Sequence, residues 1–553
     1  MLIKRALLIA CCGYISLSSA QQLPPGVQPG QLERRFEQPK KPRAAIQRLL
    51  PEMQAAQDPA TDQAVEFVLG DIVIKGTTIY RFEELLPLYQ DKLSTKITLK
   101  DLFLIAERIT DKYRQDGYVL SRAYVPAQNI RDGAAAIYVI EGYISRVTIE
   151  GNAGGSRNRL QRYADRITRS VPLHASVLER YLLLSNDMPG IKLRAVMSPA
   201  TEQLGAAILT LFIEHDTIEG FATLDNRGSE FIGPQQIQAG IVFNSFFGLP
   251  QRTQLRAISA ADSELQFAEL EHAQFINKQG TKLSLVLRNT AAEPGFAVAT
   301  LEIETDSNSG SITVEHPFVR SRPKSIYGRV ELDHFDSETT VLGALFTEDK
   351  IRSLRIGINF DFVDRHNNIN LIDLQLSQGL DVLDAIESGS ANLSRDNGRS
   401  DYTKLNIEVL RLQRLAQNWN LQLGLSVQYA ADALLISEQF GLGGANYGRA
   451  YDPSEIAGDH GIGFRSEIQY QLSTPSPAQL YSYYDVGAVE NRDTDSTTFD
   501  SESLASFGIG WRFNITKLFS GGIEFAKPLT RKVAAEGLDG NDARFFFNLV
   551  GQF

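Results

Sequence analysis

The sequence predicts two small α+β modules followed by a 16-stranded antiparallel β-barrel that spans a membrane. Helical periodicity ends at Glu219, and residues 220–553 form short alternating runs between Gly, Asn, Asp and Ser turns, as antiparallel hairpins do. In the last strand every second residue, up to the terminal phenylalanine, belongs to one alternating series: Phe545, Phe547, Leu549, Gly551 and Phe553. In a soluble protein this strand would be an aggregation-prone edge, whereas a closed barrel removes the edge.

The N-terminus has the three parts of a secretory signal. Lys4 and Arg5 form the basic part, residues 6–17 the apolar part, and residues 18–20 the small-residue cleavage site. We therefore predict a signal peptide over residues 1–20. A lipoprotein-type cleavage is the alternative, but the apolar run before the cysteines is too short for it.

Composition narrows the class of protein. Cys11 and Cys12 are the only cysteines and lie in the signal, so the mature chain has neither disulfides nor thiolate metal sites. The net charge of -11 argues against a nucleic-acid partner, which needs basic patches. No run of 18 apolar residues follows the signal, so no transmembrane helix is expected. This criterion does not detect barrel strands, because their apolar and polar residues alternate.

Residues 21–65 are rich in Pro, Gln, Ala and charge. Two stretches have helical character, Gln31 to Gln38 and Ala44 to Gln54, and prolines prevent anything longer. We predict a short helix within residues 21–38 that docks elsewhere, followed by a flexible linker over residues 39–65. A disordered tether throughout is the alternative.

Two consecutive β-α-α-β-β modules are predicted over residues 66–141 and 142–216. The first module opens with a strand over Phe67 to Ile74, and Thr98 with Asp101 forms a capping box at the start of its longer helix. The second repeats the same order of elements. Small mixed modules of this kind bind extended peptides at their sheet edges.

Residues 217–553 contain about 17 candidate strands. The weakest, Phe296 to Glu304, is assigned to an extracellular loop, which leaves the even number usual for bacterial barrels. Successive connections of an antiparallel barrel alternate between its two ends. The short turns FGLPQ, NKQG and RSRP therefore fall on one side, which we predict to be periplasmic, and the longer loops fall on the other. A large soluble β-sandwich is the alternative.

One loop is unusual: residues 439–461 hold six glycines together with Arg449, two tyrosines and several acids. We predict that residues 432–460 fold back into the barrel. Strand alternation turns Glu467 into the lumen, and Asp485 on the following strand can point the same way. The guanidinium of Arg449 could then reach both carboxylates. An ordinary salt bridge at the barrel mouth is the alternative.

Motifs of catalysis are missing from the sequence. The seven histidines are scattered, and no nucleophile elbow, phosphate loop or HExxH motif occurs. We therefore expect no enzymatic activity, no metal and no cofactor.

Four short motifs carry a family resemblance. They are Tyr124-Val125-Pro126-Ala127-Gln128 with Val139-Ile140-Glu141-Gly142, Asp225-Asn226-Arg227-Gly228-Ser229 with Gly233, Gly448-Arg449-Ala450-Tyr451, and Tyr483-x-Asp485-x-Gly487. Together they resemble the outer-membrane transporters of two-partner secretion, the haemolysin-activator type, in the superfamily that includes the barrel-assembly insertases. Gly448 and Ala450 stand where that family usually has Val and Gly.

The resemblance implies an outer-membrane pore that exports one large, unfolded partner of the TpsA type. Two periplasmic POTRA domains would capture the partner's N-terminal secretion domain, and the N-terminal helix would plug the pore. It also implies contact with outer-membrane lipid and insertion by the barrel assembly machinery. A barrel-assembly factor and a passive porin are the alternatives.

The resemblance also assigns residues. Those implied in docking the loop are Arg449, Tyr451, Glu467, Asp485, Gly443, Gly444 and Asp459. Those implied in binding the partner are Tyr124, Pro126 and Gln128.

Overall fold

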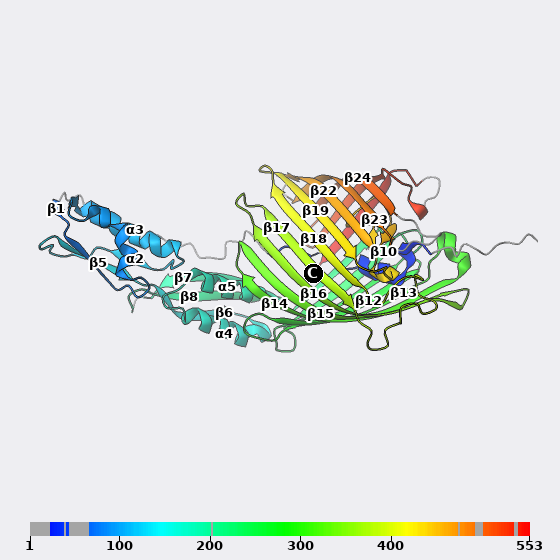
Figure 1. Ribbon diagram of the computed structural model, residues 1–553, viewed down its shortest axis with the longest axis horizontal. Coiled ribbons are helices and arrows are strands. Elements are labelled where there is room, and N and C mark those ends of the chain that lie inside the picture. Colours follow the sequence, from blue (N-terminus) through cyan, green and yellow to red (C-terminus); the bar gives the residue numbers. More distant parts are fainter. Residues whose placement is uncertain are drawn as a thin grey trace, which may run out of the picture.

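The computed structural model describes residues 23–37, 40–43, 66–200, 203–473, 476–492, 501–535 and 540–553. The signal sequence and the helix predicted from Ala44 to Gln54 lie outside these residues. Two small modules extend in a row from one end of a β-barrel (Figure 1). The fold class predicted from the sequence is confirmed.

The first module is a three-stranded sheet, ordered β2-β5-β4, with helices packed against it. Its long helix α3 begins at the predicted capping box, where Thr98 accepts from the backbone N–H of Asp101. The elements are β1 (Glu66–Val68), β2 (Asp71–Lys75), α2 (Phe82–Leu85), β3 (Lys96–Thr98), α3 (Leu99–Gln115), β4 (Arg122–Tyr124) and β5 (Ala134–Ile140), with short 3-10 turns over Leu86–Leu88 and Gln90–Lys92.

The single strand predicted over Phe67 to Ile74 is wrong, because the chain breaks between β1 and β2. Leu69 turns into the core and is fully buried, and its backbone bonds to Ser94 and Thr95 instead of to β5. β1 therefore pairs with β3, and only β2 joins the main sheet. The turn at Leu69 comes from tertiary contacts that the local sequence does not contain.

The second module repeats this arrangement, with sheet order β6-β8-β7 and the last strand in the centre. As in the first module, the first and last strands are parallel and the middle one is antiparallel. Its elements are β6 (Tyr143–Gly151), a 3-10 turn (Gly154–Ser156), α4 (Arg157–Thr168), α5 (Ala175–Asn186), β7 (Ile191–Pro199) and β8 (Ala206–His215).

Glu141 lies at the boundary between the two modules and binds the first one. Its carboxylate accepts from the backbone N–H groups of Thr78 (2.7 Å) and Ile79 (3.1 Å) and from the hydroxyl of Tyr113 (2.8 Å). The next residue, Gly142, lies against the backbone of Leu120, where a Cβ would meet the carbonyl oxygen at 2.4 Å. The motif thus closes the first module at the start of the second.

We predict that Glu141→Gln lowers the free energy of unfolding of the first module by about 1.5–3 kcal/mol, the range for hydrogen bonds to a charged group. Burial opposes ionisation, but the hydrogen bonds from Thr78, Tyr113 and Ile79 hold the pKa of Glu141 below its usual 4.5. Its stabilisation is therefore complete above about pH 4.5 and is lost as the pH falls through the lower, folded-state pKa. Hydrogen exchange of the Thr78 amide measures the loss, and the exposed Glu150→Gln is the control. Equal exchange in both variants would contradict the prediction.

The barrel is closed and has 16 antiparallel strands, as predicted. The last strand pairs with the first, and Phe553 exchanges both backbone hydrogen bonds with Gly220 (2.7 and 2.9 Å). The strands are β9 (Ile218–Asp225), β10 (Gln236–Asn244), β11 (Gln251–Ala260), β12 (Leu265–Phe275), β13 (Lys282–Ala292), β14 (Ile303–Arg320), β15 (Lys324–Val341), β16 (Ala344–Val363), β17 (Ile369–Gly379), β18 (Thr403–Arg414), β19 (Trp419–Ala430), β22 (His460–Leu472), β23 (Ala478–Glu490), β24 (Ser501–Asn514), β25 (Phe519–Pro528) and β26 (Arg544–Gln552).

The segment assigned to an extracellular loop needs one correction. Phe296–Leu301 is a 3-10 turn in the loop between β13 and β14, but Ile303 and Glu304 already belong to β14. Ile303 is buried beneath the loop and pairs with Val341 of β15. The strand therefore begins earlier than its polar sequence suggests.

The second module sets the sidedness of the barrel. Arg320, at the end of β14, forms a bidentate ion pair with Asp187 of the module (2.7 and 2.8 Å). Arg159 donates to the carbonyl of Phe275 (2.9 Å) at the β12–β13 turn. The short turns thus lie on the module side, and the long loops lie on the opposite side. No helix among the described residues is long and apolar enough to cross a bilayer.

Candidate functional site

The inward loop, residues 432–460, leaves β19 and turns into the barrel lumen. It contains a 3-10 turn (Ile436–Glu438) and a hairpin of β20 (Phe440–Leu442) and β21 (Ile456–Gly458). Its apolar residues pack on the inner faces of strands near the C-terminus, including Val489 and Leu504. The loop is thereby a buried element of the barrel interior.

Arg449 is the centre of the inward loop. Its Nε and Nη2 donate to the two carboxylate oxygens of Asp485 (2.9 and 3.0 Å), and its backbone N–H donates to the same group (3.1 Å). Its Nη1 is paired with Glu467. Asp485 is fully buried and Arg449 is 6% exposed. One guanidinium thus links the loop to two adjacent strands, the reach expected from strand alternation.

Two further contacts enclose this arginine, and both were missed in the sequence. The guanidinium lies 3.5 Å from the centroid of the Tyr483 ring, a cation–π contact between two buried side chains. Arg512 donates to both oxygens of Glu467 (2.6 and 3.1 Å), so Glu467 bridges two arginines. Arg512 points inward by alternation on β24, and that position was the available signal.

The glycines of the loop have distinct roles. Gly448, just before Arg449, has a φ of +77°, which glycine adopts without strain. Ala450 does not adopt a positive φ and is fully buried, so an alanine fits there. Gly443 has a φ of +118°, and a Cβ there would meet the carbonyl oxygen of Asp452 at 2.0 Å. Gly444 donates to the carbonyl of Tyr451 (3.1 Å).

Tyr451 and Asp459 fix the loop at other points than Arg449. The hydroxyl of Tyr451 is buried and donates to the carbonyl of Ala505 (3.1 Å) on β24. Asp459 does not join the Arg449 cluster. It binds Arg395 (2.6 Å), which comes from the loop between β17 and β18, and accepts from the backbone N–H of Arg492 (2.8 Å). Sequence reasoning missed Arg395, which lies in an irregular loop.

The N-terminal helix α1 (Pro29–Arg35), preceded by a 3-10 turn (Pro25–Val27), lies inside the barrel beside the inward loop (Figure 1). Glu33 accepts from the hydroxyls of Ser307 (2.7 Å) and Ser309 (2.6 Å) on β14. Gln31 donates to the carbonyl of Ile436 (2.7 Å) and accepts from the hydroxyl of Ser454 (2.9 Å). The helix thus binds both the barrel wall and the inward loop.

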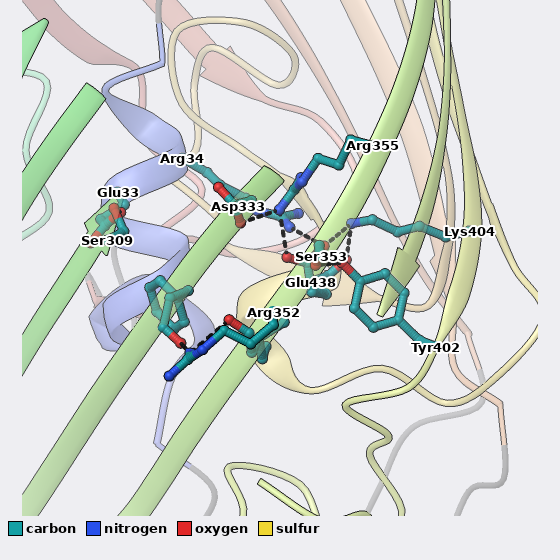
Figure 2. Close-up of polar contacts among 12 residues, drawn as sticks. Glu33, Arg34, Ser309, Asp333, Arg352, Ser353, Arg355, Tyr402, Lys404 and Glu438 are labelled. Carbon is teal, nitrogen blue, oxygen red and sulfur yellow. Dashed lines mark hydrogen bonds and ion pairs between the residues drawn. The ribbon is translucent and has the colours of Figure 1, made fainter. Parts of the chain in front are cut away.

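A buried charge cluster forms where the helix meets the inward loop (Figure 2). Arg34 of the helix, Arg355 of β16 and Lys404 of β18 all contact Glu438 of the loop, at 2.9, 3.0 and 2.5 Å. Arg355 also pairs with Asp333 of β15 (2.8 Å). Alternation marks Arg355 and Lys404 as inward-facing, but nothing local in the sequence indicates that they share one acid.

The start of the predicted linker is also bound inside the barrel. Lys40 pairs with Asp373 of β17 (2.6 Å). Arg43 pairs with Glu315 of β14 (2.9 Å), and its guanidinium lies 4.0 Å from the centroid of Tyr327. The expectation of a flexible linker is therefore wrong for residues 40–43, because inward-facing acids hold them.

The three residues expected to bind a partner lie at one edge of the first module. Tyr124 ends the edge strand β4, is 38% exposed and lies near Tyr138. Pro126 is half-buried. Gln128 donates to the carbonyl of Ala136 (2.8 Å) and accepts from its N–H (2.6 Å), so its amide extends the pairing of β5 beyond β4. Within the described residues, no group of three His, Cys, Asp or Glu could hold a metal ion.

Comparisons with known proteins identify the family of the chain. Residues 212–513 match the family described as haemolysin secretion/activation protein ShlB/FhaC/HecB, which is more than half of the chain. Residues 67–142 match the POTRA domain of ShlB type. Heme/hemopexin transporter protein HuxB of Haemophilus influenzae (strain 86-028NP) is 23% identical, with 87% of each chain covered.

Solved structures share the fold. CdiB from Escherichia coli superposes with a TM-score of 0.75 at 18% identity, covering 92% of this chain and 94% of that one. BamA from Haemophilus ducreyi, lacking POTRA domains 1–3, gives 0.52 at 15% identity, covering 88% and 100%. The barrel lies in the outer membrane, with its POTRA domains in the periplasm. The chain belongs to the haemolysin secretion/activation family ShlB/FhaC/HecB, the outer-membrane transporters of two-partner secretion.

Proposed function

We propose that this transporter is closed at rest by α1 and opens when α1 leaves the lumen to let an unfolded secreted partner pass. The observation that carries this proposal is the position of α1, bonded to the wall through Glu33 and to the inward loop through Gln31 and Arg34. A helix that is bound to both the barrel wall and the inward loop would obstruct the lumen, and its binding would depend on the position of the loop.

Arg449 is proposed to keep the inward loop in its transport-competent position. The loop has to stay folded while a polypeptide passes, and buried charge pairs resist displacement because a separated buried charge is costly. Tyr451, Asp459 and the glycines Gly443 and Gly444 would hold the rest of the loop in shape.

The POTRA domains are proposed to capture the partner's N-terminal secretion domain in the periplasm. The edge strand β4, with the exposed Tyr124 and the neighbouring Pro126, offers one docking edge for an added strand. Gln128 occupies the adjacent backbone of β5 and would set where such a strand ends. The passenger is proposed to be a secreted protein of the TpsA type, whose folding outside the cell drives transport without an enzymatic step. The barrel would be inserted by the barrel assembly machinery.

Co-expression with the product of the neighbouring gene tests the export function. If that product is a large secreted protein, we expect it in the medium only when the transporter is present. A transporter-independent medium level would contradict the proposal. Reduced levels of other outer-membrane barrels in a strain lacking this chain would favour the barrel-assembly factor instead.

A further inference from the structure

The lumen carries four acidic side chains towards its module side, where residues 40–43 lie against the barrel wall. They come from β14, β16, β17 and β18 and are Glu315, Asp361, Asp373 and Glu408. We call these four residues the acidic patch. Each of them contacts Lys40 or Arg43. The acidic patch is therefore a site that a basic segment of the chain itself already occupies.

Lys40 lies between two acids that face each other on neighbouring strands. Asp373 of β17 and Glu408 of β18 are directly paired in register, and like charges in that position are destabilising. The ammonium of Lys40 contacts both carboxylates, at 2.6 and 3.7 Å. Asp373 also pairs with Arg329 of β15 (2.7 Å), whereas Glu408 pairs with no wall cation among the described residues. A cation at the position of Lys40 is therefore favourable, whichever chain supplies it.

Arg43 occupies a site made of a carboxylate and an aromatic ring. Its Nη2 donates to both oxygens of Glu315 (3.1 and 2.9 Å), and its guanidinium lies 4.0 Å from the centroid of the buried Tyr327 ring. Lys282 of β13 shares Glu315 at the longer distance of 3.5 Å. An ion pair combined with a cation–π contact suits an arginine better than a lysine.

The backbone of Arg43 is bound as well. Its N–H donates to Asp361 Oδ2 (3.1 Å), and its carbonyl accepts from Arg320 (3.4 Å). Asp361 is fully buried, and its Oδ1 accepts from no described residue, so one acceptor beside the bound segment is open to another donor. These contacts use backbone groups that every polypeptide carries.

We propose that the acidic patch also binds a basic, extended segment of the passing polypeptide, which replaces residues 40–43 there. This inference rests on the proposed export function. Residues 40–43 read Lys-Lys-Pro-Arg, and two cations three residues apart lie roughly 10 Å from each other in an extended chain. The occupant is therefore an unfolded stretch with two basic residues at that spacing.

Residues 40–43 can be replaced because part of the acidic patch is accessible. The side chains of Lys40 and Glu408 are 39% and 45% exposed while they are in contact. An entering basic segment can thus bind Glu408 before Lys40 has left. Exchange at the acidic patch frees the chain that follows α1, so the arrival of the passenger and the departure of α1 are linked.

Binding of a labelled peptide with the sequence of residues 39–44, PKKPRA, tests the acidic patch. The host is the full mature chain in lipid nanodiscs, with Lys40→Ala and Arg43→Ala, which vacate the patch and leave the barrel wall unchanged. We expect saturable binding by fluorescence anisotropy, weakened by added salt because the contacts are ionic. A peptide with glutamine at the three basic positions should not bind.

Glu315→Gln in this host should weaken the binding about tenfold, the effect of 1.4 kcal/mol, because the arginine of the peptide loses its ion pair. Asp361→Asn keeps the size of the buried side chain and should also weaken the binding, even if Glu315→Gln does not assemble. Glu304→Gln is the matched control, because Glu304 is exposed at the opposite end of the same strand, β14. Equal affinity in all hosts, equal loss in Glu304→Gln, or binding of the glutamine peptide would overturn the proposal.

The acidic patch and the export function can fail separately. Export of the partner by the wild type, together with no binding of the peptide, would reject the patch alone. Binding of the peptide without any partner in the medium of the co-expression strain would reject the export function, and with it the passenger as the occupant of the patch.

Discussion

Arg449→Ala is expected to lower secretion of the partner at least about tenfold while the barrel still assembles. The substitution leaves Asp485 fully buried without its guanidinium partner, and breaking a buried ion pair in this way costs about 3–5 kcal/mol. That cost falls on the inward loop, because the paired strands β22 and β23 keep their backbone register. The loop should therefore loosen in a closed barrel.

Immunoblotting of the partner in the medium, at equal levels of transporter in the outer membrane, measures the effect. Arg411→Ala is the control, since Arg411 of β18 pairs with Asp364 (3.0 Å). Its contacts among the described residues reach neither the inward loop nor the two carboxylates. Glu467→Gln should be milder than Asp485→Asn, because Asp485 forms three of the contacts to Arg449. Normal secretion by Arg449→Ala would reject the proposed role of the loop.

Gly30→Leu is expected to open the resting pore. Gly30 brings α1 against the inward loop so closely that a Cβ would lie 2.2 Å from the Cβ and 2.5 Å from the Cα of Ser437. Overpacking of this kind costs about 1–3 kcal/mol. Since 1.4 kcal/mol changes an equilibrium tenfold, the fraction of molecules without the helix in place should rise about five- to a hundredfold.

Conductance in planar bilayers measures the opening. Deletion of Gln21 to Gln38 sets the fully unplugged level, and Gly30→Leu should approach it. Glu37→Ala is the control, because Glu37 is exposed just beyond the helix. If the deletion leaves the conductance unchanged, α1 does not close the pore. If the deletion raises it and Gly30→Leu does not, the close contact with Ser437 is not what holds the helix.

Features with a local cause were predictable from the sequence. The Thr98 cap, the alternating barrel strands and the inward direction of Glu467 depend on neighbours within a few residues or on strand period alone. The contacts of Arg449 could be predicted as well, because alternation places Glu467 and Asp485 on the same inward face of consecutive strands, as diagonal neighbours.

Other features depend on partners distant in the chain, and the sequence did not predict them. Glu33 accepts a hydrogen bond from Ser307, which lies 274 residues further along the chain. Asp459 pairs with Arg395, which lies in a loop without periodicity. The break between β1 and β2 has a similar cause, since Leu69 leaves the strand to enter a core built by later elements. Such contacts become visible only when the strand order and the loop paths are known.

The charges around Glu438 favour the return of α1 to the lumen after it has left. If α1 leaves the lumen as proposed, it takes Arg34 with it, and Arg355 and Lys404 then face Glu438, Asp333 and Glu331, two cations against three anions. Among these residues one negative charge is then unpaired, and it favours the return of Arg34. Because α1 belongs to the same chain as the barrel, its proposed return is intramolecular and does not depend on the amount of transporter in the membrane. Under the proposed function, the channel would therefore reseal by itself after a passenger has passed.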